Sequence, residues 1–161
     1  FGYFLSWMQD KTSSVYVIAT ANNADNLPPE LKRKGRFDEI FCVNLPTKEE
    51  REAIFKVHLN KRKKSVWGNV NIDEIASEYA GKTAGFNGAD IESVINESVE
   101  QLFRDRGSSS KKDLSTIIGE KIKETISISK SCKKQIDSMA EVFKLSSFKD
   151  ASTGKLTGGS K

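Results

Sequence analysis

The chain has 161 residues, of which 37% are hydrophobic and 30% charged, and its formal net charge is +4. This composition is typical of globular proteins, and its hydrophobic content is well above that of disordered chains. No apolar run approaches the roughly 20 residues that a membrane-spanning helix needs, so we expect no membrane partner. One histidine and two cysteines without CxxC spacing predict no metal site. Cys42 and Cys132 are predicted to be buried free thiols in a reducing compartment.

The first 46 residues show an α/β pattern. A helix is predicted over residues 2–9, and its apolar face consists of Tyr3, Phe4, Trp7 and Met8. The β-branched run over residues 15–20 predicts a strand that is buried on both faces of a parallel sheet. A short helix is expected over residues 29–34, because proline favours a first turn and Gly35 favours a helix end. A second strand is expected over residues 40–45.

The remainder of the chain shows helical periodicity. Thr47 and Glu50 have the spacing of a capping box, which begins a helix that runs to about Lys61. Further helices are predicted over residues 72–80, after Asn87, after a loop at residues 107–110, and from about Ser131. The side chains predicted to face inward are Ile54, Phe55, Val57, Ile72, Ile75, Ala76, Tyr79, Ile91, Val94, Ile95, Val99, Leu102, Leu114, Ile117, Ile118, Ile122, Cys132, Ile136, Met139, Ala140 and Phe143.

These patterns divide the chain into an α/β segment over residues 1–46, a helical segment over 47–145 and a flexible tail over 146–161. Two strands do not make a stable parallel sheet, so we expect partner strands outside this sequence. The chain has no initiator methionine and begins within a helical pattern. We therefore expect it to be a fragment of a longer protein.

Residues 17–38 read Val-Ile-Ala-Thr-Ala-Asn-Asn-Ala-Asp-Asn-Leu-Pro-Pro-Glu-Leu-Lys-Arg-Lys-Gly-Arg-Phe-Asp. This long ordered pattern strongly resembles the second region of homology of the AAA clade of ATPases. Residues 4–9, 53–58 and 85–91 also match, and the resemblance covers about residues 1–143. Within this clade, the sequence most resembles the stand-alone AAA proteins of plastid and cyanobacterial genomes. The implied fold is the C-terminal part of a P-loop-type α/β AAA+ domain, followed by an all-α helical lid.

The resemblance implies a role for three polar residues of the α/β segment. Asn22 follows the first predicted strand, at the sheet edge where ligands of open α/β folds bind. By resemblance it is the sensor-1 residue, which orients the attacking water, although Asn-Asn is also ordinary turn chemistry. Arg33 and Arg36 match arginine fingers that act on ATP of a neighbouring subunit. The alternative is a solvated basic turn.

Three residues of the helical segment match the nucleotide side of the lid. His58 matches a histidine near adenine, although a lone histidine is more often simply a satisfied surface or core residue. Gly88 and Ala89 open a helix, and small residues there let backbone N–H groups approach a ligand. By resemblance they occupy the sensor-2 position. The alternative is a tight turn with Asn87 as the helix cap, and both readings are compatible.

The resemblance implies an ATP hydrolase that works with ATP and Mg²⁺ as a homo-oligomeric ring, a hexamer, and remodels macromolecules. The sequence has no Gly-x-x-x-x-Gly-Lys-[Ser/Thr] and no apolar strand ending in Asp-Glu. We therefore expect the Mg²⁺ ligands to lie outside this chain, and the chain alone to be inactive. The expected location is the cytoplasm or the plastid stroma, and the sequence does not indicate the protein substrate.

The sequence is also compatible with two other functions. A degenerate AAA relative could lend Arg33 and Arg36 to an active neighbour without turnover of its own. Residues 107–161 hold 11 lysines and 6 acidic residues, a basic balance that also raises nucleic-acid binding. These lysines alternate with acidic residues, with no arginine and no interleaved aromatics beyond Phe143 and Phe148, so a solvated face is favoured over a nucleic-acid surface.

Overall fold

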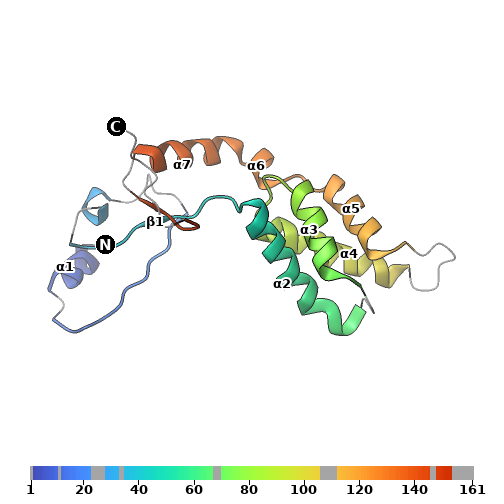
Figure 1. Ribbon diagram of the computed structural model, residues 1–161. Coiled ribbons are helices and arrows are strands. Elements are labelled where there is room, and N and C mark those ends of the chain that lie inside the picture. The colour runs from blue at the N-terminus through green and yellow to red at the C-terminus, as the bar shows by residue number, and fades with distance from the viewer. Residues whose placement is uncertain are drawn as a thin grey trace. The chain divides into compact units, whose positions relative to one another are not determined.

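The structure is a computed structural model, shown in Figure 1, and it describes residues 2–10, 12–22, 28–32, 35–66, 70–105, 112–145 and 148–153. The contacts within it divide the chain into two units. The first contains residues 1–44 and 134–161, and the second contains residues 45–133. The chain therefore passes from one unit to the other twice. None of the helices within the described ranges combines the length and apolar character that crossing a bilayer requires.

The second unit is a helical bundle. It consists of α2 (Lys48–Val66), α3 (Ile72–Lys82), α4 (Gly88–Arg104), α5 (Leu114–Glu124) and α6 (Ile128–Ser131). Helix α2 packs against α3 and α4, and α5 packs against α4 and α3, as Figure 1 shows. The side chains at the centre of its core are Phe55, Leu59, Ile91, Val94, Ile95 and Ile118. Their 3.6-residue spacing explains why each helix buries one face.

Local capping explains where these helices begin. The Glu50 carboxylate accepts from the Thr47 amide at 2.8 Å, and the Thr47 hydroxyl accepts from the Glu50 amide at 3.3 Å. The predicted capping box is thus confirmed. Asn71 and Asp113 cap α3 and α5 through their side chains. Each cap satisfies an amide that has no partner within its helix.

The first unit contains α1 (Gly2–Asp10), the 3₁₀ helix η1 (Pro29–Lys32), β1 (Phe41–Cys42), β2 (Lys149–Asp150) and all but the first residue of α7 (Lys133–Leu145). β1 and β2 pair in parallel, with Phe41 opposite Lys149 and Cys42 opposite Asp150. Cys42 is buried, as predicted, and its thiol donates to the Lys149 carbonyl at 3.4 Å.

The predicted strand over residues 15–20 is wrong for this structure. In the described part of the chain the sheet consists of β1 and β2 alone, and residues 14–20 lie outside it. Tyr16 and Ile18 are 89% and 79% exposed, although their types suit a buried strand. A parallel strand forms only by hydrogen bonding to a neighbouring strand, so a β-branched run by itself remains extended chain.

The C-terminal predictions also need correction. Residues 148–153, which were assigned to a flexible tail, contain β2, and Phe148 is buried with its ring edge against Phe143. The predicted final helix is α7, and the short helix α6 precedes it, whereas Cys132, predicted to be buried, is only partly buried. The contacts group α7 with the first unit, and the predicted end of the helical segment at residue 145 stays a prediction. The predicted loop at residues 107–110 lies outside the described ranges.

Some predicted inward positions are exposed. Tyr3 is 88% and Val57 61% exposed, whereas Met8 and Phe55 on the same helices are buried. Ile136, Met139, Ala140 and Phe143 on α7 are half-buried. Helical spacing predicts which side chains share a face, but the width of the buried stripe depends on the partner that covers it.

Candidate functional site

The predicted arginine-finger segment follows the 3₁₀ helix η1. Gly35 has φ of +89°, the left-handed conformation that favours glycine. The predicted end of the short helix at residue 34 lies outside the described residues. Arg36 follows, and its Nη1 donates to the Leu5 carbonyl of α1 at 2.7 Å. This bond holds the guanidinium at the end of a defined turn, partly buried. Arg33 lies outside the residues that the structure describes.

Asn22 is exposed, in a bend that follows the extended residues 14–21. Its amide is therefore open to a ligand or a water molecule. The sheet edge on which the prediction placed it does not form among the described residues, because residues 15–20 make no strand. The sensor-1 role of Asn22 stays a prediction.

The start of α4 is a capped turn that opens with two small residues. The Asn87 side chain accepts from the Asp90 amide at 2.8 Å, and the Asp90 carboxylate accepts from the Asn87 amide at 3.1 Å. This capping box leaves Gly88 and Ala89 in the first turn. A Cβ at Gly88 would meet nothing within 4 Å, and Ala89 is exposed. A side chain at Gly88 would therefore meet no steric obstacle, and Ala89 faces solvent at the start of the helix.

His58 faces α4 from α2. Its Nδ1 lies 3.7 Å from Glu92 Oε1, and its side chain is 19% exposed. One helical turn further along, Arg62 donates to the Asn96 side chain at 2.7 Å. The two pairs form a polar row along the α2–α4 contact. His58 thus lies on the same pair of helices as Gly88 and Ala89, and it retains some access to solvent.

The predicted site residues fall into two groups. Asn22 and Arg36 belong to the first unit, whereas His58, Gly88 and Ala89 belong to the second. Within the second unit the structure places the histidine helix α2 and the start of α4 in one bundle. The assignment of these residues to a nucleotide site remains a prediction.

Sequence reasoning missed two residues that join distant parts of the second unit. Arg51 is 7% exposed, and its guanidinium donates to the carbonyls of Pro46 and Ala80. Asp90 accepts from the Ile128 amide at 3.0 Å, a contact that spans 38 residues. The only sequence signal was the position of Asp90 within the Gly-Phe-Asn-Gly-Ala-Asp-Ile motif. Nothing in the pattern indicates a partner so far along the chain.

A nucleotide is compatible with the lid residues that are present. The open space beside Gly88 leaves room for close approach to the backbone, and the adjacent Asp90 carboxylate is engaged by two backbone amides. Among the described residues, no three histidine, cysteine or acidic side chains gather as they would around a metal ion. That these lid residues contact a nucleotide stays a prediction.

Comparison with known families now identifies the class of protein. Residues 1–45 match the ATPase family associated with various cellular activities (AAA), and residues 69–116 match the AAA+ lid domain. The chain therefore belongs to the AAA family of ATPases, with an AAA segment followed by a lid. The predicted family and fold class are confirmed.

Individual relatives support the same assignment. The chain is 49% identical over 105 residues to the uncharacterized AAA domain-containing protein ycf46 of Guillardia theta, covering 65% of this chain and 20% of that protein. It is 40% identical over 139 residues to the protein of the same name from Pyropia yezoensis, covering 86% and 27%. The ATP-dependent zinc metalloprotease FTSH 9, chloroplastic, of Arabidopsis thaliana is 43% identical over 88 residues, covering 55% and 10%. The chain thus spans about a fifth to a quarter of the length of the ycf46 proteins.

Proposed function

We propose that the chain is the arginine-finger and lid portion of an ATP hydrolase that works with Mg²⁺ as a homo-oligomeric ring, a hexamer, and remodels macromolecules. One observation carries this proposal. A single chain joins an AAA segment with a defined Gly35–Arg36 turn to a lid whose α4 begins with the accessible Gly88 and Ala89. Its relatives from algae and a chloroplast support a location in the plastid stroma or cytoplasm.

The proposed roles follow from the chemistry of each side chain. Bound ATP would supply the phosphoryl group that is transferred to water. Arg33 and Arg36 stabilise the charge that develops on the phosphoryl oxygens of a neighbouring subunit, because a planar guanidinium matches that geometry. Asn22 holds the attacking water through a neutral amide. His58 and the backbone of Gly88 and Ala89 contact the base and ribose.

The test uses the full-length protein that contains this chain. Arg33→Ala and Arg36→Ala should each lower kcat for ATP by about 10³-fold or more, the usual effect of losing an arginine finger, with little change in KM. Lys56→Ala is a matched control, because its charge is paired on the lid surface with Glu52 and Asp73. It should leave kcat unchanged.

Mixing subunits separates an acting finger from a residue that is merely structural. Arginine variants mixed with subunits that cannot bind ATP should recover part of the activity, because each kind supplies what its neighbour lacks. Failure of the mixture to recover activity would refute action on a neighbouring subunit. Full-length subunits without turnover that still activate a competent AAA neighbour would establish the passive ring subunit instead.

A further inference from the structure

One carboxylate joins two helix starts that are far apart in sequence. Asp90 is the third residue of α4, and its Oδ2 accepts from the Asn87 amide at 3.1 Å and from the Ile128 amide at 3.0 Å. Ile128 is the first residue of α6, whose own cap residue, Ser127, makes no side-chain capping bond. Asp90 therefore supplies from α4 the acceptor that local sequence does not provide for α6.

Further contacts fix the same junction. The Ser129 amide donates to the Gly85 carbonyl at 3.3 Å, and the Ser127 and Ser129 hydroxyls lie 3.0 Å apart. Ser127 is only 2% exposed. A Cβ at Gly85 would lie 2.1 Å from Ser129 Oγ, so the loop before α4 and the start of α6 touch without spare room. Such a junction transmits a displacement, because packed groups have no free volume to absorb it.

The junction lies beside two features of functional interest. Gly88 and Ala89, the proposed nucleotide contacts, are in the same helical turn as Asp90. On the other side, α6 ends at Ser131, immediately before α7 begins at Lys133 and the chain passes into the first unit. Asp90 thus stands between the proposed nucleotide turn and one of the two connections that link the units.

We propose that Asp90 is a positioning residue that couples the first turn of α4 to α6 and, along the chain, to the start of α7. The inference rests on the proposed nucleotide contact at Gly88 and Ala89. Nucleotide binding that orders the α4 turn is expected to order α6 as well, through the shared carboxylate.

Two variants remove the hydrogen bond between Asp90 and the Ile128 amide, one by changing the acceptor and one by changing the donor. Asp90→Ala removes the acceptor for both amides. Ile128→Pro removes only the α6 donor, and the position suits proline because it is the first residue of a helix and Ser127 has ψ of 150°. Asp113→Ala is the matched control, since Asp113 caps α5 through the Thr116 amide within its own turn. Asp90→Asn retains an acceptor oxygen and should restore much of the coupling.

Amide hydrogen exchange of the full-length protein without nucleotide tests whether the Asp90–Ile128 bond links α4 to α6. Asp90→Ala should speed exchange about tenfold in residues 85–91 and also in residues 127–132, as expected for loss of a charge-assisted bond. Ile128→Pro should affect residues 127–132 alone, and Asp113→Ala should affect neither segment. If the effect of Asp90→Ala stayed within residues 85–91, Asp90 would be a local cap and the coupling would be refuted.

The same measurement with ADP tests the coupling. In the wild type ADP should slow exchange in both segments, whereas in Asp90→Ala and Ile128→Pro it should slow only residues 85–91. Asp90→Asn should regain protection of residues 127–132. Equal protection of both segments in all variants would overturn the proposal. If ADP protected neither segment in the wild type, both the proposed nucleotide contact and its coupling to α6 would be refuted. The nucleotide-free comparison would still show whether Asp90 links α4 to α6.

Discussion

The Arg51 guanidinium lies against the last turn of α3, where its Nε and Nη2 donate to the Ala80 carbonyl at 3.3 and 2.8 Å. Its Nη1 donates to the Pro46 carbonyl at 2.7 Å. Carbonyls at a helix end lack helical partners and carry the negative end of the helix dipole, so a buried cation is well placed there. Arg51 thereby fastens the chain entering the helical unit to the end of α3.

Replacing Arg51 should therefore destabilise the helical unit strongly. Arg51→Met keeps much of the side-chain volume but removes the donors to a buried carbonyl, that of Ala80, and to a partly buried one, that of Pro46. This loss should lower the free energy of unfolding by about 2–4 kcal/mol. Urea denaturation measures this loss. Arg62→Met is the control, because its bond to Asn96 is exposed and should contribute less than about 1 kcal/mol. Equal losses of unfolding free energy in the two variants would show that the bonds to Pro46 and Ala80 stabilise the unit no more than an exposed bond does.

Gly85 should tolerate no side chain, in contrast to Gly88. Gly85 has φ of +81°, and a Cβ there would lie 2.1 Å from Ser129 Oγ, whereas a Cβ at Gly88 would meet nothing within 4 Å. Gly85→Ala should lower the free energy of unfolding by about 1–3 kcal/mol, while Gly88→Ala should leave it unchanged or raise it slightly. Thermal unfolding of the two variants side by side decides this. A similar melting temperature for both would contradict the close contact.

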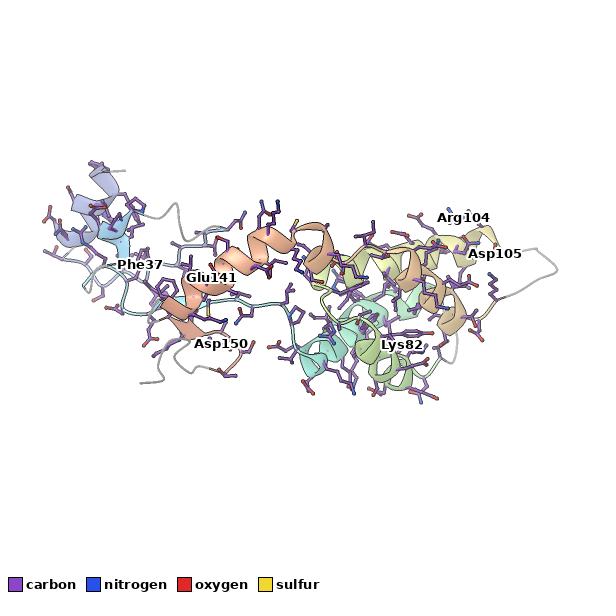
Figure 2. All side chains as sticks on the ribbon, turned by 90° about the horizontal axis from the view of Figure 1, so that it is seen from above. Phe37, Lys82, Arg104, Asp105, Glu141 and Asp150 are labelled. Carbon is purple, nitrogen blue, oxygen red and sulfur yellow. The ribbon has the colours of Figure 1, made fainter. Side chains whose placement is uncertain are left out.

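The β1–β2 pair should weaken in acid. Backbone hydrogen bonding from Thr153 and a bond from the Asn44 amide lower the pKa of Asp150, which Figure 2 labels. A carboxyl group with a lowered folded pKa stabilises the protein above its ordinary pKa of about 3.9, and that contribution is lost as pH falls through the folded value. Asp150→Asn should therefore reduce the fall in unfolding free energy between about pH 5 and pH 3. An unchanged pH profile would show that Asp150 contributes no net stability.

Phe55 and Val57 should respond differently to truncation, although sequence periodicity placed both inward. Both residues lie on α2, but Phe55 is fully buried in the core of the helical unit and Val57 is 61% exposed. Phe55→Ala should cost about 3–5 kcal/mol through lost transfer energy and the cavity left behind. Val57→Ala should change stability by less than about 0.5 kcal/mol in the isolated chain. A large loss at Val57 would indicate that a partner covers this face of α2 in solution.

Sequence reasoning predicted the helical unit well because its determinants are local. The Thr47–Glu50 capping box, the cap at Asn87 and the apolar spacing of α3 and α4 all involve residues within a few positions of each other. The AAA and lid assignments follow from equally contiguous motifs. Among the candidate site residues, Arg36 and His58 could be named from sequence, but their contacts with Leu5 and Glu92 could not.

The sequence by itself determined the helices, their caps, the apolar faces of the lid bundle and the family, because periodicity and motif act over one or two turns. Only the tertiary structure decided which extended segments become strands. Residues 15–20 stay outside the sheet, while Lys149 and Asp150 enter it, because a strand exists only through hydrogen bonds to another segment. The tie from Asp90 to Ile128 is of the same kind. A contact across 38 residues leaves no periodic trace, and the fold alone brings its two ends together.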